Sequence, residues 1–278
     1  ISLGYKKIGL TPATGDIFMD KGIDQKFQYL DTLEKYEGFF FYTNFIPINT
    51  TQIEKLILNT KKLLSFGISI YGHNLETFKN FCSGTESAYL RLITNLKKLL
   101  DIHEKYPEKK FSILISQRSE IDFVLNKNDS ELSKILKRLL KISGITYDQN
   151  FVYNNWGGII KEEDVKGLNI KLQSENTEKI GSCSLIYSRL TIGSNGLVNA
   201  CACRDANFSL RIGSVKEKKL KDIISLKNKR YKEIIENQEQ NKFDPVCKSC
   251  DFYKSIYKEN YPTWVLQKQK NKKYSLKS

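Results

Sequence analysis

The sequence predicts an α/β protein in which a mostly parallel sheet is covered by helices, followed by a small cysteine-bearing domain. Up to about residue 170, short apolar runs alternate with segments of helical periodicity. Such alternation, with strands that are mostly apolar, is typical of a parallel sheet. Beyond about residue 175 the alternation stops, and five of the six cysteines follow. We therefore expect a first domain over 1–175, a second over 176–255 and a basic tail over 256–278.

The predicted elements of the first domain follow one another in regular order. Apolar runs predict strands over 6–11, 38–45, 65–71, 110–116 and 145–153. Helical periodicity predicts helices between them, over about 20–36, 51–64, 75–81, 87–106 and 130–142. Thr51 and Glu54 have capping-box spacing at the start of the second helix, and Asp129 and Ser130 precede the last.

The predicted second domain begins with a β-hairpin. In "SRLTIGSNGLVNACAC" (188–203) the residues SNG form a turn between two runs of alternating polarity. A short strand follows in "SLRIGSV" (209–215), and a lysine-rich helix over about 220–238 leads into "DPVCKSCDFY" (244–253). The cysteines thus lie on a hairpin and on a C-x2-C segment of one small domain.

Composition limits the classes of protein to consider. A hydrophobic content of 40% and a charged content of 27% are those of a soluble globular protein. The sequence contains neither an apolar run of about 18 residues nor a signal-peptide pattern, so we expect no membrane span and a cytoplasmic location. Net charge is +14, but only 7 of the 45 basic residues are Arg. Because Arg is the preferred residue at specific phosphate and base contacts, this excess gives weak support to nucleic-acid binding.

Small polar residues follow each predicted strand of the first domain. In a parallel sheet the carboxyl ends of the strands carry the functional groups, so these segments define the candidate site. They are Thr11–Asp16, Thr43 and Asn44, Ser69–His73, Ser116–Glu120 and Asn154–Gly158. The two histidines, His73 and His103, have no nucleophile at a recognisable spacing, which disfavours a hydrolase of the Ser-His type.

The cysteines of the second domain allow more than one interpretation. In a reducing compartment, clustered thiols hold metal more often than they form disulfides. Cys183 and Cys201 are 18 residues apart, Cys247 follows after 46, and Cys250 after 3 more. From spacing alone, a zinc site of four cysteines and an iron–sulfur cluster are both open. Buried unligated thiols are a third alternative. We expect Cys82, at a helix end, to be a core or boundary residue and not a ligand.

Several of these segments resemble one enzyme family. "SFGISIYGHNLETFKNFCSG" (65–84), followed by "AYLRLITNLKKLL" (88–100), is similar to the fourth strand and following helices of radical S-adenosylmethionine enzymes. "GLTPATGDIFMD" (9–20) resembles their second-strand motif, and "NNWGG" (154–158) resembles the sixth-strand ending of some members. The cysteine pattern is similar to an auxiliary-cluster domain of the SPASM or twitch type, and the resemblance covers roughly residues 5–255.

The resemblance implies a partial (β/α)6 barrel and an oxygen-sensitive oxidoreductase. Such enzymes begin with hydrogen-atom abstraction by a 5′-deoxyadenosyl radical, from a sugar-like or peptide substrate, with flavodoxin or ferredoxin as electron donor. Their catalytic [4Fe-4S] cluster needs a C-x3-C-x2-C triplet, which this sequence lacks. We expect the first βα unit to be missing, which leaves this chain inactive by itself and its catalytic residue unassigned. A degenerate member that has lost the cluster is the alternative.

The resemblance also implies which residues bind S-adenosylmethionine. These are Thr14, Gly15, Asp16, Ser69, Tyr71, Arg118, Asn155 and Trp156. Three of them have a structural alternative: Asp16 as a helix N-cap, Arg118 in a salt bridge to Glu120 or Asp122, and Trp156 as a packed side chain.

For the second domain, the resemblance implies one auxiliary [4Fe-4S] cluster held by Cys183, Cys201, Cys247 and Cys250, with an electron-transfer role. Cys203 lies on the same face as Cys201 and is a fifth candidate. The competing hypothesis is a non-catalytic binding protein with a zinc-stapled tail, either a degenerate barrel or a basic nucleic-acid binder.

Overall fold

The computed structural model describes residues 3–12, 14–109, 112–149, 151–173, 178–201 and 205–257. Two compact units make up the chain. The first comprises Ile1–Asn150 and Gly167–Asn169, and the second comprises Phe151–Lys166 and Ile170–Ser278. The chain therefore passes into its second unit about 25 residues before the boundary expected near 175.

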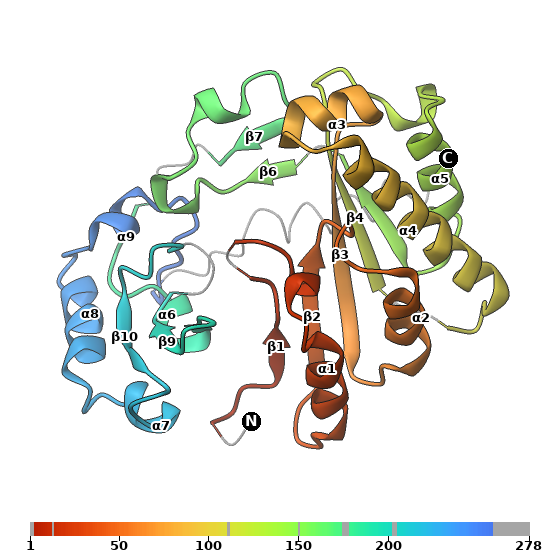
Figure 1. The fold of residues 1–278 in the computed structure, drawn as a ribbon. Helices are drawn as coiled ribbons and strands as arrows, with labels where there is room; N and C mark the ends of the chain where they lie inside the picture. The colour runs from red at the N-terminus through yellow and green to blue at the C-terminus, as the bar shows by residue number, and fades with distance from the viewer. Residues whose placement is uncertain are drawn as a thin grey trace. The chain divides into compact units, whose positions relative to one another are not determined.

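The first unit is built on five parallel strands: β1 (Lys7–Gly9), β2 (Gly38–Thr43), β3 (Leu63–Tyr71), β4 (Ser112–Arg118) and β5 (Ile145–Asp148). Their order in the sheet is their order in the sequence (Figure 1). This confirms the predicted α/β class and parallel pairing. The five strands form an open sheet, not a closed barrel, and all their carboxyl ends lie at one edge.

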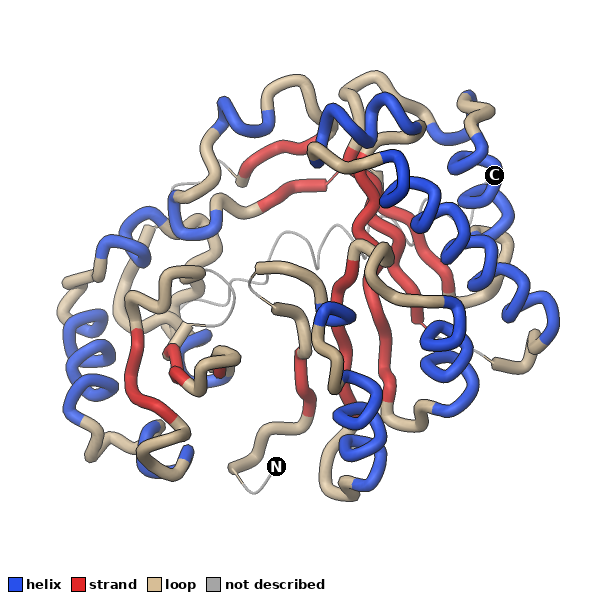
Figure 2. The backbone as a smooth tube through the Cα atoms, viewed as in Figure 1, coloured by secondary structure: helices blue, strands red, loops and turns tan. Residues whose placement is uncertain are grey.

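Helices cover one face of this sheet (Figure 2). They are α1 (Ile23–Thr32), α2 (Thr50–Asn59), α3 (Leu75–Cys82), α4 (Glu86–Lys105) and α5 (Glu131–Leu139), with short 3₁₀ turns η1 (Ile17–Met19) and η2 (Leu125–Lys127). Ser130 caps α5 as predicted, through a 3.2 Å bond from the Ser133 amide. The capping box of α2 is formed by Asn49 and Gln52, two residues before the predicted pair. The Gln52 amide donates to Oδ1 of Asn49 at 2.9 Å.

Alternation along the strands divides the sheet into a helix-facing and an opposite face. Phe39, Phe41, Phe66, Ile68 and Ile113 are fully or almost fully buried in the helix-facing core. Burying each such side chain stabilises the fold by about 1.5–3 kcal/mol. On the other face of β3 and β4, Ser69, Ser116 and Arg118 are only partly buried. The opposite face thus carries polar groups at its carboxyl end.

The second unit contains two small sheets. Strand β6 (Phe151–Tyr153) runs parallel to β7 (Ile170–Leu172), while β8 (Thr191–Ile192), β9 (Leu197–Asn199) and β10 (Arg211–Ser214) are antiparallel. The predicted hairpin is confirmed. The helical segments are η3 (Trp156–Gly158), η4 (Glu162–Val165), α6 (Leu185–Ser188), α7 (Leu220–Ile223), α8 (Lys229–Glu239) and α9 (Pro245–Ser249).

Two predicted elements are divided in the structure. The run 145–153, expected as one strand, forms β5 of the main sheet and β6 of the second unit, so Asn154–Gly158 does not end a strand of the main sheet. The helix expected over 220–238 is interrupted between α7 and α8. Asn228 caps α8 there, and its amide donates to the carbonyls of Ile212 and Ile223, both at 2.7 Å.

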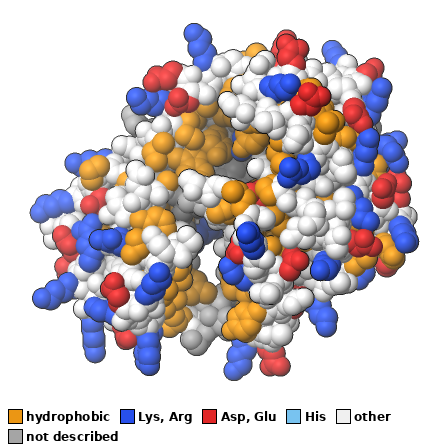
Figure 3. All heavy atoms as spheres, viewed as in Figure 1, with side chains coloured by type: hydrophobic (Ala, Val, Ile, Leu, Met, Phe, Trp, Pro, Cys, Tyr) orange, Lys and Arg blue, Asp and Glu red, His pale blue; other side chains and the backbone are white. Residues whose placement is uncertain are grey.

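Charge is mixed over the face drawn in Figure 3. Lys and Arg side chains on that face are interspersed with Asp and Glu and form no continuous basic patch. Within the residues that the structure describes, no helix has the length and apolarity needed to cross a bilayer.

Candidate functional site

Four cysteines of the second unit line one cavity of about 30 Å³. They are Cys183, Cys201, Cys247 and Cys250. The rest of the wall is mostly apolar and is made by Leu185, Ile186, Leu210, Gln238, Val246, Phe252 and Tyr253. Within the described residues, none of these four cysteines forms a disulfide. The structure therefore brings together the four cysteines that the family resemblance implies as ligands, whereas Cys203 lies outside the described residues.

Three separate parts of the second unit deliver these thiols. Cys183 precedes α6 and forms an isolated antiparallel bridge with Ser255. Cys201 follows β9, and its carbonyl accepts bonds from Asn199 at 3.1 Å and from Thr191 at 3.2 Å. Cys247 lies within α9, and Cys250 caps its end. Backbone bonds of the hairpin and helix thus fix the position of each cysteine.

Two of the sulfurs accept hydrogen bonds. The Phe252 amide donates to Sγ of Cys250 at 3.3 Å, and Nε2 of Gln238 donates to Sγ of Cys247 at 3.4 Å. Oε1 of Gln238 accepts from the Cys183 amide at 2.9 Å. Gln238 therefore connects two of the three cysteine-bearing segments through one buried side chain.

The environment of the cavity favours the protonated form of two of its thiols, those of Cys247 and Cys183. Burial, followed by the neighbouring thiols of Cys250 and Cys183 and by Asp244 and Asp205, raises the pKa of Cys247 to about 12. Burial also raises the pKa of Cys183. A bound metal reverses this balance, because thiolates are the metal-binding form and a cation stabilises them.

The donor set fits a thiophilic metal group. Four soft sulfur ligands in an apolar wall suit an iron–sulfur cluster or zinc. Over the described ranges, no three His, Cys, Asp or Glu side chains are arranged so that they could hold a metal ion. The four cysteines thus share one cavity, although no three of the described side chains are placed to bind a single ion.

The segment after β6 packs against the C-x2-C segment. Nδ2 of Asn155 donates to the Ser249 carbonyl at 2.7 Å, and the Asn155 amide donates to Oδ2 of Asp251 at 2.7 Å. Gly158 has a φ of +90°, and a Cβ there would lie 2.7 Å from Cβ of Ser249. Asn155 and Gly158 thus hold the residues on either side of Cys250. Trp156 lies between them in η3, half-buried.

Asp16 lies at the carboxyl edge of the first unit's sheet. It is buried, and its Oδ1 accepts from the Phe18 amide at 3.0 Å, which makes it the N-cap of η1. Its Oδ2 accepts from the Thr43 hydroxyl at 2.8 Å and from the Asn44 amide at 2.7 Å. Asp16 is therefore a helix N-cap, as the structural alternative proposed. Its carboxylate also connects the segment after β1 to the end of β2.

Thr14 and Gly15 form the exposed turn before Asp16. Gly15 has a φ of +83°, in the left-handed region that residues with a Cβ seldom adopt. The turn thus presents backbone groups to solvent next to a buried carboxylate.

Ser69, Tyr71 and Arg118 lie on the polar face of the neighbouring strands β3 and β4. Tyr71 pairs with Arg118 in the parallel register, and the guanidinium carbon lies 5.1 Å from the centre of the Tyr71 ring. Glu120, one of the two carboxylates considered as partners of Arg118, is paired with His73 instead. The three cofactor candidates of these strands are therefore brought together.

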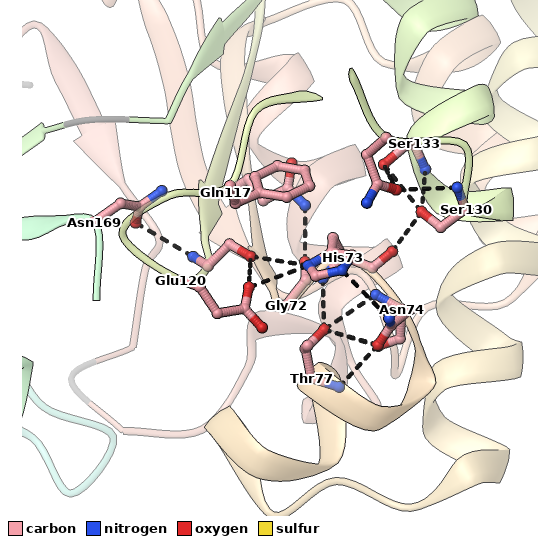
Figure 4. Close-up of polar contacts among 12 residues, drawn as sticks. Gly72, His73, Asn74, Thr77, Gln117, Glu120, Ser130, Ser133 and Asn169 are labelled. Atoms are coloured by element: carbon pink, nitrogen blue, oxygen red, sulfur yellow. Dashed lines mark hydrogen bonds and ion pairs between the residues drawn. The ribbon is translucent and has the colours of Figure 1, made fainter. Parts of the chain in front are cut away.

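His73, Ser119, Glu120 and Asn169 form a polar cluster at the same edge (Figure 4). Nδ1 of His73 lies 3.1 Å from Oε2 of Glu120 and 3.2 Å from Oγ of Ser119, whose hydroxyl donates to Glu120. Oδ1 of Asn169 accepts from the Ser119 amide at 3.2 Å. Phe123 stacks on the imidazole, with the ring centres 4.7 Å apart.

Sequence reasoning missed this cluster, because His73 and Glu120 are 47 residues apart. The available signal was their common position just after two neighbouring strands. The arrangement does not make a Ser-His hydrolase. Ser119 is fully buried, and its proton is directed to Glu120, so the imidazole receives none from it.

Comparison with known proteins supports the assignment of the second unit. The SPASM family model, described as an iron-sulfur cluster-binding domain, matches residues 183–251. No curated protein matches the sequence. The predicted SPASM-type domain is thus confirmed over the segment that contains all four cysteines of the cavity.

Solved structures are similar to a larger part of the chain. A structure of BtrN in complex with AdoMet and 2-DOIA is 14% identical, over 91% of this chain and 75% of that one, with a TM-score of 0.48. Native anSMEcpe with bound AdoMet is 15% identical, over 89% and 74%, with a TM-score of 0.44. Native anSMEcpe with bound AdoMet and Kp18Cys peptide is 14% identical, over 88% and 75%, with a TM-score of 0.43.

Proposed function

We propose that this chain, which carries a SPASM iron–sulfur domain over 183–251, belongs to a radical S-adenosylmethionine oxidoreductase. In this proposal the second unit holds one [4Fe-4S] cluster through Cys183, Cys201, Cys247 and Cys250. The single observation that carries it is the lining of one apolar cavity by all four of these cysteines. Four thiolates are the ligand set that such a cluster requires.

The proposed role of this cluster is electron transfer. Four cysteine ligands, one for each iron, leave no iron open to substrate. The apolar wall limits access of water to the metal group and so favours reversible oxidation and reduction over ligand exchange.

The first unit is proposed to bind S-adenosylmethionine at the carboxyl edge of its sheet. The residues assigned to this role are Thr14, Gly15, Asp16, Ser69, Tyr71 and Arg118. When bound together with a reduced catalytic cluster, the cofactor supplies the radical chemistry that starts with hydrogen-atom abstraction. The protein contributes a buried carboxylate at Asp16, a guanidinium held on the Tyr71 ring, and the half-buried polar face of β3 and β4.

Asn155 and Trp156, also expected at the cofactor, receive a different proposed role. The hydrogen bonds of Asn155 go to Ser249 and Asp251. Both residues belong to the segment that packs on α9. We therefore assign them to support of the cysteine site.

The proposed substrate is a sugar-like alcohol or a peptide, whose two-electron oxidation would deliver one electron to the auxiliary cluster. Two polar side chains at the edge of the first sheet support this proposal. Glu120 is about one-third exposed, and the buried Nδ2 of Asn169 has no hydrogen-bond partner within the described part of the chain. Electron donors of the flavodoxin or ferredoxin type complete the proposed system.

Anaerobic analysis of iron, sulfide and zinc in the reconstituted chain tests the proposal. We expect about four irons and four sulfides per chain, with the broad visible absorption of a [4Fe-4S] cluster. One zinc without sulfide would contradict it and favour the zinc-stapled binding protein.

A further inference from the structure

The wall of the cysteine cavity contains one amide side chain, that of Gln238, which is not among the proposed ligands. Gln238 is fully buried on α8 and lines the cavity together with the four cysteines. A buried amide is costly to retain unless its hydrogen bonds are made. The side-chain amide of Gln238 bonds with two cysteine residues, Cys183 and Cys247.

The orientation of the Gln238 amide is fixed by chemistry. The backbone N–H of Cys183 can only donate, so the amide oxygen must face it, at 2.9 Å. The amide nitrogen is then directed toward Sγ of Cys247, at 3.4 Å. Exchange of the two amide atoms would place two donors against each other, so the N–H···S contact follows from the Cys183 bond.

We propose that Gln238 is a positioning residue that sets the reduction potential of the metal group held by these cysteines. This inference depends on the proposed iron–sulfur function. Gln238 fixes the Cys183 segment relative to Cys247, which is 64 residues later (247 − 183). Through its N–H it also stabilises negative charge on the Cys247 sulfur. One-electron reduction adds such charge, so the bond is stronger in the reduced state and raises the potential.

The apolar surroundings strengthen this effect. Leu185, Ile186, Val246 and Phe252 form the adjacent wall, and water does not compete well there for the sulfur. Hydrogen bonds to sulfur are among the factors that tune cluster potentials, together with solvent exposure and net charge. Gln238 controls the first of these without being a ligand.

Two substitutions of Gln238 distinguish an effect on the reduction potential from mere support of the cysteine segments. Gln238→Glu keeps an oxygen that can accept from the Cys183 amide but removes the N–H donor to Cys247. Gln238→Met removes both contacts at similar volume. Gln240→Met makes the same chemical change at an exposed position two residues along the chain and serves as the matched control.

The experiment is an anaerobic redox titration of the full reconstituted chain, followed by visible absorption and electron paramagnetic resonance. In both Gln238 variants we expect the reduced-to-oxidised ratio at a fixed potential to fall about tenfold, equivalent to a midpoint about 59 mV lower for a one-electron couple. The Gln240→Met midpoint should equal that of the wild type.

The possible results distinguish this inference from the proposed function. A wild-type midpoint in Gln238→Glu, with iron retained, would overturn the role of Gln238. Loss of iron from both Gln238 variants but not from Gln240→Met, with unchanged circular dichroism, would support it as a positioning residue. Zinc without sulfide in the wild type would instead overturn the iron–sulfur function itself.

Discussion

The imidazole Nδ1 of His73 lies 3.1 Å from Oε2 of Glu120, although 47 residues separate them in the sequence. His73 follows β3 and Glu120 follows β4, and these strands are parallel neighbours. The Asn74 amide contacts the other ring nitrogen at 3.3 Å. The carboxylate of Glu120 can only accept, so Nδ1 carries the proton of this contact, while Nε2 faces the Asn74 side-chain amide.

This pair predicts a pH dependence of stability. Burial alone would raise the pKa of Glu120, but the hydrogen bond from Ser119 and the attraction to His73 outweigh burial and lower it. A carboxyl with a lowered folded-state pKa stabilises the fold above its unfolded pKa, near 4.5, and that contribution is lost as pH falls through the folded value. Because Glu120 is about one-third exposed, we expect less than about 1 kcal/mol.

Urea unfolding of the wild type and Glu120→Gln between pH 3 and pH 7 would measure this difference. The difference in unfolding free energy between the two proteins should be constant near pH 7 and should disappear near pH 3. Glu108→Gln, at an exposed position, is the control. A difference that grows as pH falls would contradict the assignment.

Substitution of the cavity cysteines should remove the metal group. Cys183→Ala, Cys201→Ala, Cys247→Ala and Cys250→Ala each delete one of four thiolates, and we expect each to lose most of the iron while the first unit stays folded. Cys82→Ala should retain it, because Cys82 lies in α3 and donates to the Phe78 carbonyl. Iron per chain and far-ultraviolet circular dichroism measure both properties. Undiminished iron in Cys247→Ala would rule that residue out as a ligand.

Because η3 lies close to α9, we expect a glycine-to-alanine substitution in η3 to destabilise the fold more than one at a glycine with free space around it. Gly158→Ala introduces a Cβ at 2.7 Å from Ser249 and strains a backbone with a φ of +90°. Gly167 has a similar φ of +80° but nothing within 4 Å of such a Cβ. We expect Gly167→Ala to cost about 1–2 kcal/mol from strain alone, and Gly158→Ala to cost more.

Denaturant unfolding measures the loss of unfolding free energy in both variants. Iron retention gives a second readout for Gly158→Ala. Equal costs for the two glycines would show that the contact with Ser249 is easily relieved. Loss of iron only in Gly158→Ala is expected, since Ser249 is adjacent to Cys250.

The bond between Asp16 and Thr43 should contribute to the stability of the first unit. Both side chains are buried, and the hydroxyl donates to the carboxylate at 2.8 Å. A double-mutant cycle of Asp16→Asn and Thr43→Val, measured by denaturant unfolding, should give a coupling free energy of about 1.5–3 kcal/mol. This is the range for a hydrogen bond to a charged group. Additive effects would show that Asp16 acts mainly through its bonds to the amides of Phe18 and Asn44.

Some of the site could be predicted from the sequence because its signals are local. The turn "SNG" and the alternation on either side of it predict the hairpin that precedes Cys201, and the spacing of Cys247 and Cys250 predicts paired ligands. The capping box of α2 was predicted two residues late, because Asn49 and Gln52 have the same spacing as Thr51 and Glu54. Local patterns therefore identify an element more reliably than its first residue.

The run 145–153 shows a different limit. Its residues have strand-like character throughout, so the sequence contains no sign that β5 pairs with β4 while β6 pairs with β7. Pairing is a choice between distant partners, and apolar periodicity does not encode it. The consequence was the expectation that Asn155 ends a strand of the main sheet.

The sequence by itself determined the order of strands and helices, the parallel sheet and the presence of a cysteine-bearing domain, because periodicity and residue type depend only on neighbours along the chain. Only the tertiary structure decided that His73 meets Glu120, that Asn155 holds Asp251, and that Gln238 joins Cys183 to Cys247. The contacts of His73 with Glu120, of Asn155 with Asp251 and of Gln238 with Cys183 each span at least 47 residues, whereas Gln238 and Cys247 are 9 residues apart. They form because packing of the two hydrophobic cores brings distant segments together, and no local pattern specifies which side chains then meet.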